Sequence, residues 1–192
     1  MIGHVITAQE VKARWAFSEI TSSRFGVFYR RLLPSSLYDF AKSGGAFANV
    51  DEAEWVNLEK ALKTVRPAGF VDNITGVAGA AQYECVGWSV GDLLNCTTLP
   101  VFGEVPYWQF LVLPPKQDER TGKTQSTDPR SLSHTISFDP SFQVQEPLIA
   151  IGLSDKKMLF EGYLRSILWL RNPQEPLIAW FPKRQAGHPN TT

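Results

Sequence analysis

Residues 161–166 (EGYLRS) hold the side chains that are best suited to phosphate chemistry. We expect a short strand to end at Glu161 and a helix to begin after Gly162, because glycine interrupts the apolar run before it. The free backbone N–H groups and the positive end of the helix dipole then meet at this turn. Arg165 lies in the first helical turn, where its planar guanidinium can donate two parallel hydrogen bonds to a phosphate. The segment therefore predicts an anion site.

Each side chain of this segment has a candidate role that follows from its type and position. Gly162 allows the backbone to approach a phosphate closely, and Ser166 offers a hydroxyl to the same anion. Glu161 could hold a magnesium ion or orient a water molecule for attack on phosphorus. The alternative interpretation is structural: Gly162 makes the turn, Arg165 forms an ion pair with Glu161, and nothing binds.

The elements that must position this segment are predicted from apolar runs and their breaks. The expected order is a buried strand over 147–153, a turn over 154–157, a return strand over 158–161, a helix ending near 171–173, and a second buried strand over 176–181. Leu164, Ile167 and Leu168 are expected to line one face of the helix. The hexapeptide QEPLIA occurs at 145–150 and again at 174–179, which indicates two similar strand entries on either side of this helix.

This arrangement over residues 145–182 resembles the ParB/sulfiredoxin-like superfamily, in which a Gly-x-x-Arg segment opens a helix after a short strand. The matching residues are Phe160, Glu161, Gly162, Arg165 and Ser166. The resemblance implies a single α+β domain over 1–192, with helices packed on a small mixed sheet, and a segment that binds nucleotide phosphates. Members include CTP-dependent chromosome-partition proteins, an ATP-dependent thiol-repair enzyme and several nucleases. The resemblance does not extend to residues 1–140.

Departures from the superfamily pattern narrow what the resemblance implies. Sulfiredoxins have Cys-His and partition proteins usually have Glu-Arg where this chain has Tyr163 and Leu164. The chain therefore lacks the cysteine that sulfiredoxins use for thiol chemistry. It also lacks the Glu-Arg pair of the partition proteins that switch with CTP. The chain is most similar to the plasmid fertility-inhibition proteins of the Osa type, which block export of DNA by a type IV secretion system and are associated with ATPase and DNase activity.

That closer resemblance implies an ATP-hydrolysing, metal-dependent DNA nuclease that suppresses conjugative transfer. Its implied nucleotide-binding residues are Gly162, Tyr163, Arg165 and Ser166, and its implied catalytic residues are Glu161 and Arg165. ATP and Mg²⁺ are the expected ligands, with Glu161 at the metal. DNA and a component of the conjugation machinery are the expected partners, in the bacterial cytoplasm or at the inner face of the cell membrane. The alternative is a non-catalytic inhibitor that binds nucleotide or protein and covers a surface of the secretion machinery.

A second segment, residues 24–31 (RFGVFYRR), alternates cations with aromatic residues. Phosphate contacts and base stacking by such a combination can hold single-stranded nucleic acid. We therefore assign Arg24, Arg30 and Arg31 to a weak DNA-binding surface. The alternating pattern also describes a half-buried strand with arginines at its ends, and this alternative stays open.

Other elements are predicted from caps and periodicity. A capping box at Thr7 starts a helix that runs to about Trp15, and another helix follows Pro34. Acidic residues from Asp51 precede a helix whose buried face holds Trp55, Leu58, Leu62 and Val65. Residues 105–113 are strand-like, residues 116–137 are a long polar loop, and residues 183–192 form a tail.

Composition excludes several classes of protein. The 192 residues fit one domain, and 19 Lys and Arg balance 19 Asp and Glu, so the chain is not a histone-like polycation. Cys85 and Cys96 cannot form a disulfide framework, and no Cys/His cluster has the spacing of a zinc site. No P-loop motif is present. The apolar runs are too short for a transmembrane segment, and the expected compartment is therefore the cytosol.

Overall fold

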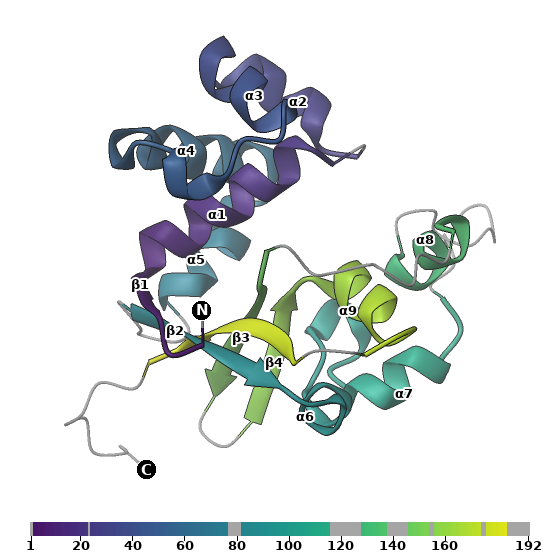
Figure 1. Cartoon of the computed structure of the whole chain (residues 1–192). Helices are drawn as coiled ribbons and strands as arrows, with labels where there is room; N and C mark the ends of the chain where they lie inside the picture. Colours follow the sequence, from purple (N-terminus) through teal and green to yellow (C-terminus); the bar gives the residue numbers. More distant parts are fainter. Residues whose placement is uncertain are drawn as a thin grey trace. The chain divides into compact units, whose positions relative to one another are not determined.

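The computed structural model describes residues 2–22, 24–76, 82–115, 128–137, 146–153, 156–173 and 176–183. The chain divides into two units (Figure 1). We call Val5–Glu84 with Pro182–Thr192 the helical unit, and Met1–His4 with Cys85–Phe181 the sheet unit. Helices and a mixed sheet make the fold α+β, which confirms the predicted fold class. Among the residues just given, no helix is both long and apolar enough to cross a membrane.

The helical unit is built mainly from five helices in its described part. It contains β1 (Val5–Thr7), α1 (Ala8–Ile20), α2 (Gly26–Leu32), α3 (Ser35–Lys42), η1 (Phe47–Asn49), η2 (Glu52–Glu54), α4 (Trp55–Val65) and α5 (Ala68–Gly76). The predicted cap of α1 is confirmed, because Thr7 Oγ1 accepts a hydrogen bond of 3.1 Å from the backbone N–H of Glu10. The helix continues five residues beyond the predicted end at Trp15, to Ile20.

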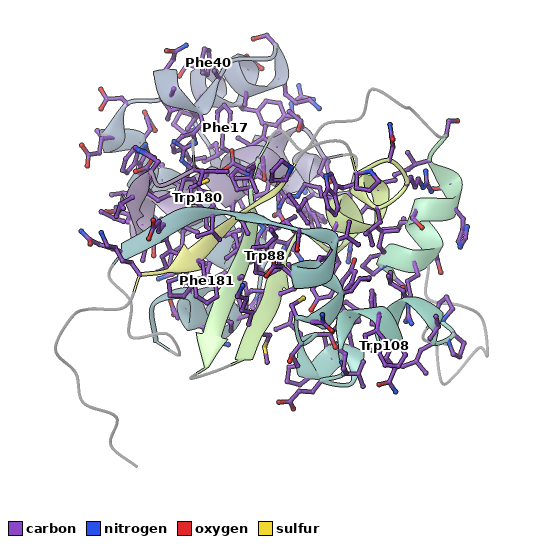
Figure 2. All side chains as sticks on the ribbon, turned by 60° about the horizontal axis from the view of Figure 1, so that its bottom comes forward. Phe17, Phe40, Trp88, Trp108, Trp180 and Phe181 are labelled. Atoms are coloured by element: carbon purple, nitrogen blue, oxygen red, sulfur yellow. The ribbon has the colours of Figure 1, made fainter. Side chains whose placement is uncertain are left out.

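The predicted helices α3 and α4 are confirmed, but Trp55 and Val65 of the predicted buried face of α4 are only partly buried. Asp51 caps η2, which leads directly into α4, and Leu58 and Leu62 of α4 are fully buried. Phe17 of α1 packs against Phe40 of α3 and Phe47, with ring centroids 6.3 and 5.6 Å apart (Figure 2). The amphipathic faces of these helices therefore meet in one aromatic core.

The strand alternative for residues 24–31 is wrong, because Gly26–Leu32 form α2. Tyr29 is fully buried and its hydroxyl donates a 2.8 Å hydrogen bond to Glu19 of α1. Glu19 is only 6% exposed and also accepts hydrogen bonds from Trp15 Nε1 (3.0 Å) and Arg66 Nε (3.0 Å). A buried carboxylate with three donors from separate elements fixes α2 against α1, which local sequence patterns do not reveal.

The sheet unit contains the predicted strand, hairpin, helix and strand. Its elements are the end of β2 (Gln82–Trp88), α6 (Val90–Asn95), η3 (Pro100–Phe102), α7 (Tyr107–Val112), α8 (Pro129–Thr135), β3 (Leu148–Leu153), β4 (Lys156–Glu161), α9 (Tyr163–Trp169) and β5 (Leu177–Pro182). The strands pair in the order β1-β2-β5-β3-β4. The two QEPLIA copies enter β3 and β5, which pair in parallel with Leu148 opposite Ala179.

Several boundaries in this unit differ from the sequence predictions. β4 begins at Lys156, so the predicted turn is shorter, and residues 154–155 lie outside the described part. The buried side of α9 is formed by Tyr163, Ser166 and Trp169, whereas Leu164, Ile167 and Leu168 are partly exposed. The predicted face of α9 was therefore wrong, because packing partners outside the helix decide which side is covered.

The strand predicted over 105–113 is wrong, since residues Tyr107–Val112 form α7. Part of the predicted 116–137 loop is also helical, as α8, while residues 116–127 and 184–192 lie outside the described part. A short apolar run fits a strand or a buried helix equally well. A tertiary contact favours the helix here: Arg130 of α8 donates hydrogen bonds from Nη1 to the carbonyls of Phe110 (3.0 Å) and Leu113 (2.8 Å).

Two arginines thus cap helices to which they do not belong. Arg130 is 8% exposed and is neutralised by Asp128, which is 4% exposed and accepts a 2.6 Å hydrogen bond from Nη2. Arg171, which follows α9, donates hydrogen bonds to the carbonyls of Ser133 and Ile136 at the end of α8. A cation at a helix C-terminus satisfies free carbonyls and opposes the helix dipole. These bonds join α7 to α8 and α8 to α9.

Candidate phosphate site at the start of α9

The turn between β4 and α9 requires glycine for two reasons. Gly162 caps α9 with a φ of 106°, in the left-handed region that other residues rarely adopt. A Cβ atom at this position would also overlap Cδ2 of Leu148 in β3. The turn lies on the edge strand of the sheet, where Glu161 pairs with Ile149 across a β-bulge. The local geometry therefore brings β4 into α9 at the point that the sequence predicted.

Arg165 folds back over this turn. Its Nη1 donates a 2.6 Å hydrogen bond to the backbone carbonyl of Glu146, and its Nη2 is 3.4 Å from the position that a Cβ of Gly162 would take. The side chain is partly buried. No ion pair joins it to Glu161 or to another described carboxylate, so the structural alternative for this pair is wrong. The guanidinium is held in place by the backbone carbonyl of Glu146.

Ser166 and Tyr163 are turned into the interior. Ser166 is fully buried, and its hydroxyl donates to the carbonyl of Tyr163 (2.8 Å) and lies 2.6 Å from the hydroxyl of Tyr107. The Tyr163 hydroxyl donates to the carbonyl of Leu159 (2.7 Å) and accepts from the N–H of Leu99 (2.8 Å). Burial raises the pKa of Tyr163 well above its usual value. Both hydroxyls therefore hold the helix in place and are directed away from Arg165's side of the turn.

At this turn Glu161 and Arg165 are partly exposed and Gly162 between them is buried, whereas the hydroxyls of Ser166 and Tyr163 are taken up by hydrogen bonds in the interior. Sequence reasoning missed Tyr107 entirely. It lies in the segment predicted as a strand, and its fully buried ring lies 6.1 Å from that of Tyr163. No local signal places a residue beside one that is 56 positions away along the chain.

The predicted metal ligand, Glu161, is partly buried at the end of β4. In the described ranges, no group of three or more His, Cys, Asp and Glu side chains could hold a metal ion. Magnesium is commonly bound by one or two carboxylates together with substrate phosphates and water. Glu161 therefore fits an ion that is shared with nucleotide phosphates and does not fit a site made of protein ligands alone.

The predicted DNA-binding arginines belong to the helical unit. Arg30 and Arg31 are exposed on α2, and Arg24 precedes it with its guanidinium carbon 4.5 Å from the centre of the Phe25 ring. Residues 161–166 belong to the sheet unit. The two predicted sites therefore belong to different units of the chain.

Two pockets of the sheet unit were not predicted. One, of about 550 Å³, is lined by Ile2, Gly87, Trp88, Ser89, Val90, Asp92, Trp169, Pro173 and Pro176. The second, of about 490 Å³, is lined by Ser89, Gly91, Asp92, Asn95, Cys96, Thr97 and Lys157. Hydrogen bonds from Ser89 and from Lys157 lower the pKa of Asp92 to about 2. The sequence pattern Ser-x-x-Asp, which forms a capping box at the start of α6, could have identified Ser89 and Asp92. Neither pocket includes residues 161–166.

The cysteines that line or adjoin these pockets are chemically quiet. Cys85 and Cys96 are buried and form no disulfide, and burial raises the pKa of the Cys96 thiol to about 12. A thiol at neutral pH is then protonated and is a poor nucleophile.

Comparisons of the chain with protein-family models, with curated proteins and with solved structures give no match. The likeness to the ParB/sulfiredoxin-like superfamily thus stays a prediction from residues 145–182. Functional inference has to start from the geometry of the site itself.

Proposed function

We propose that the protein binds nucleotide phosphates beside Arg165, and that it couples ATP hydrolysis to metal-dependent DNA cleavage that suppresses conjugative transfer through a type IV secretion system. The observation that carries the proposal is a partly buried guanidinium, fixed over Gly162 by one carbonyl and without a described acidic partner. Such a group retains N–H donors for an incoming anion. The choice of ATP as the nucleotide, the nuclease activity and the role in conjugation rest on the resemblance of residues 145–182 to the ParB/sulfiredoxin-like superfamily.

Arg165 would bind phosphate without first losing another bond to an anion. Its Nη1 can stay on the carbonyl of Glu146 while the remaining N–H groups donate to phosphate oxygens. Because the carbonyl already orients the side chain, less conformational entropy is lost on binding. Because Gly162 carries no side chain, the backbone of the turn can pack closely against Leu148 and the Arg165 guanidinium.

Glu161 is the residue that we assign to the reaction itself. Its carboxylate would hold a magnesium ion together with the nucleotide phosphates, and such an ion neutralises the charge that develops on the transferred phosphoryl group. Alternatively, the carboxylate would accept a proton from the attacking water and so orient it. In both cases Arg165 stabilises the phosphate that receives the attack. The proposed location is the bacterial cytoplasm or the inner face of the cell membrane, beside a conjugation component.

Arg165→Ala is expected to weaken binding of ATP by about tenfold or more, because a charge-assisted hydrogen-bond pair contributes roughly 1.5–3 kcal/mol. Isothermal titration calorimetry with ATP and magnesium measures the change. Arg165→Lys keeps the charge but loses the planar fork, and an intermediate affinity is expected. Lys60→Gln removes an exposed cation from α4 and serves as the control. Equal affinities for wild type and Arg165→Ala, with both proteins folded, would exclude Arg165 from the site.

The same variants test the enzyme. Purified protein is incubated with plasmid DNA and ATP, with magnesium or with a chelator. Nicking that requires the metal and is lost in Arg165→Ala and Glu161→Gln supports the nuclease. If the folded wild-type protein hydrolyses neither ATP nor DNA, the proposed catalytic activity is excluded and only nucleotide binding remains.

A specific observation favours the second candidate, a non-catalytic inhibitor that covers part of the secretion machinery. Trp108 and Val112, one helical turn apart on α7, are 50% and 74% exposed. Exposed tryptophan is frequent at the energetic centre of protein interfaces.

Trp108→Ala separates the two candidates. If α7 is the inhibitory surface, this variant restores plasmid transfer from donor cells that express it, and Arg165→Ala continues to inhibit. A mating assay with both variants at matched expression measures the difference. The reverse pattern, in which only Arg165→Ala restores transfer, favours the nucleotide-dependent enzyme.

A further inference from the structure

The outward side of α2 is apolar over most of its width. Successive residues of an α-helix are about 100° apart, so Val27, Arg31, Phe28 and Leu32 follow one another around the exposed face of this helix. Val27, Phe28 and Leu32 are 57%, 52% and 41% exposed. Figure 1 shows α2 beside α3 at one end of the helical unit. Three large apolar side chains on one short helix therefore face solvent.

The orientation of α2 is fixed by the buried side of the same helix. Tyr29 is fully buried and donates its hydroxyl to Glu19, which is itself held by Trp15 and Arg66. Rotation of the helix would bury Phe28 but would break this hydrogen bond inside the core. The buried hydrogen bond of Tyr29 therefore fixes the apolar residues of α2 in their exposed position.

This face lies in a segment with positive charge and no negative charge. Between Glu19 and Asp39 the chain has three arginines, Arg24, Arg30 and Arg31, and no Asp or Glu, although the whole chain is neutral. Arg30 and Arg31 are exposed, and neither makes an ion pair within the part of the chain that the structure describes. The face therefore suits an anionic partner that also accepts aliphatic side chains.

We propose that α2 docks on an anionic lipid bilayer, with Val27, Phe28 and Leu32 entering the headgroup region and Arg30 and Arg31 contacting lipid phosphates. Apolar side chains flanked by arginines are the combination that binds a helix in the plane of the interface. Seven residues provide little apolar area, so the binding is reversible and depends on anionic lipid. This inference extends the proposed location at the membrane and does not depend on Arg165.

Single-stranded DNA, which the sequence suggested for these arginines, suits the observed face less well. Base stacking needs successive exposed rings. Phe25 is already contacted by the guanidinium groups of Arg24 and Arg66, at 4.5 and 4.0 Å, and Tyr29 is buried. Phe28 alone among the three aromatic residues of this segment is largely exposed, and its exposed neighbours on α2 are aliphatic residues and arginine, with no second exposed ring.

Flotation of the full chain with two kinds of vesicle tests the proposal. We expect binding to vesicles of phosphatidylcholine mixed with phosphatidylglycerol, and none to phosphatidylcholine alone. Phe28→Ser should weaken binding by about tenfold through lost apolar burial. Arg30→Gln and Arg31→Gln should each weaken it by about fivefold at low salt. Matched controls on α4 are Val56→Ser, at a residue that is 58% exposed, and Lys60→Gln, which should bind as wild type does.

Two results would overturn the proposal. One is a folded wild-type protein that fails to float with the anionic vesicles. The other is vesicle binding that survives Phe28→Ser and the arginine variants while these variants lose binding to a single-stranded oligonucleotide, which would assign the face to nucleic acid. Arg165→Ala should float like wild type whether or not it has lost ATP binding, so failure of the nucleotide proposal is distinguishable from failure of this one.

Discussion

Glu19→Ala is expected to lower the free energy of unfolding of the helical unit by about 3 kcal/mol. The substitution removes the shared acceptor of Trp15 Nε1 and the Tyr29 hydroxyl, and it leaves the guanidinium of Arg66 without its carboxylate. Because Trp15 and Tyr29 are almost fully buried, water cannot replace the lost acceptor without opening the core. Urea unfolding followed by circular dichroism measures the change.

A matched control lies on the same helix. Glu10 forms an ion pair of 2.9 Å with Arg14 one turn away, and both side chains are more exposed than Glu19. Glu10→Ala should cost about 1 kcal/mol or less, because Glu10 has one partner a single turn away and is less buried than Glu19. Glu19→Gln, which keeps one acceptor oxygen, should fall between the two. Equal effects of the alanine variants would show that the buried network has no special energetic role.

Gly162→Ala is expected to cost about 3 kcal/mol and to abolish binding of ATP at the turn. A left-handed backbone at a residue with a side chain costs roughly 1 kcal/mol. Overlap between the new methyl group and Leu148 adds roughly 1–3 kcal/mol, because β3 cannot move away without disturbing its pairing. The new methyl group also approaches Nη2 of Arg165, which displaces the guanidinium from the carbonyl of Glu146.

Three further variants separate these contributions: Gly3→Ala, Leu148→Ala, and Gly162→Ala combined with Leu148→Ala. Gly3 has a φ of 82° and open space around its Cβ position, so Gly3→Ala should show the backbone cost of roughly 1 kcal/mol alone. In a Leu148→Ala background the overlap disappears, and Gly162→Ala should then cost no more than Gly3→Ala. Thermal unfolding of wild type, Gly162→Ala, Leu148→Ala and the double variant gives the coupling energy between the two positions. Strict additivity of the Gly162 and Leu148 substitutions would contradict the overlap.

The fold was predicted best where proline or glycine marks the beginning or end of an element. Pro147 and Pro176 mark the entries of two buried strands and Gly162 marks the turn between β4 and α9, and these local signals were sufficient. Helix α7 was predicted as a strand because its cap comes from Arg130, outside the segment. Tertiary contacts decided that element, and local preference did not.

The candidate site was predictable in part, for the same reason. Glu161, at the predicted strand end, and Arg165, in the predicted first turn of the helix, lie on either side of Gly162, and the structure has both at this turn. Ser166 looked equivalent to Arg165 in the sequence, yet Tyr107 draws its hydroxyl inward from a distant part of the chain. The carbonyl of Glu146, which orients Arg165, is equally distant and has no sequence signature.

The two arginine caps described above make three helices open as one cooperative segment. If α8 leaves its place, the carbonyls of Phe110 and Leu113 lose Arg130, and Arg171 loses the carbonyls of Ser133 and Ile136. Local unfolding proceeds in such contiguous blocks. We therefore expect the Trp108 surface on α7 and the end of α9 to be lost together on local unfolding, and a partner that binds α7 to stabilise α9 as well.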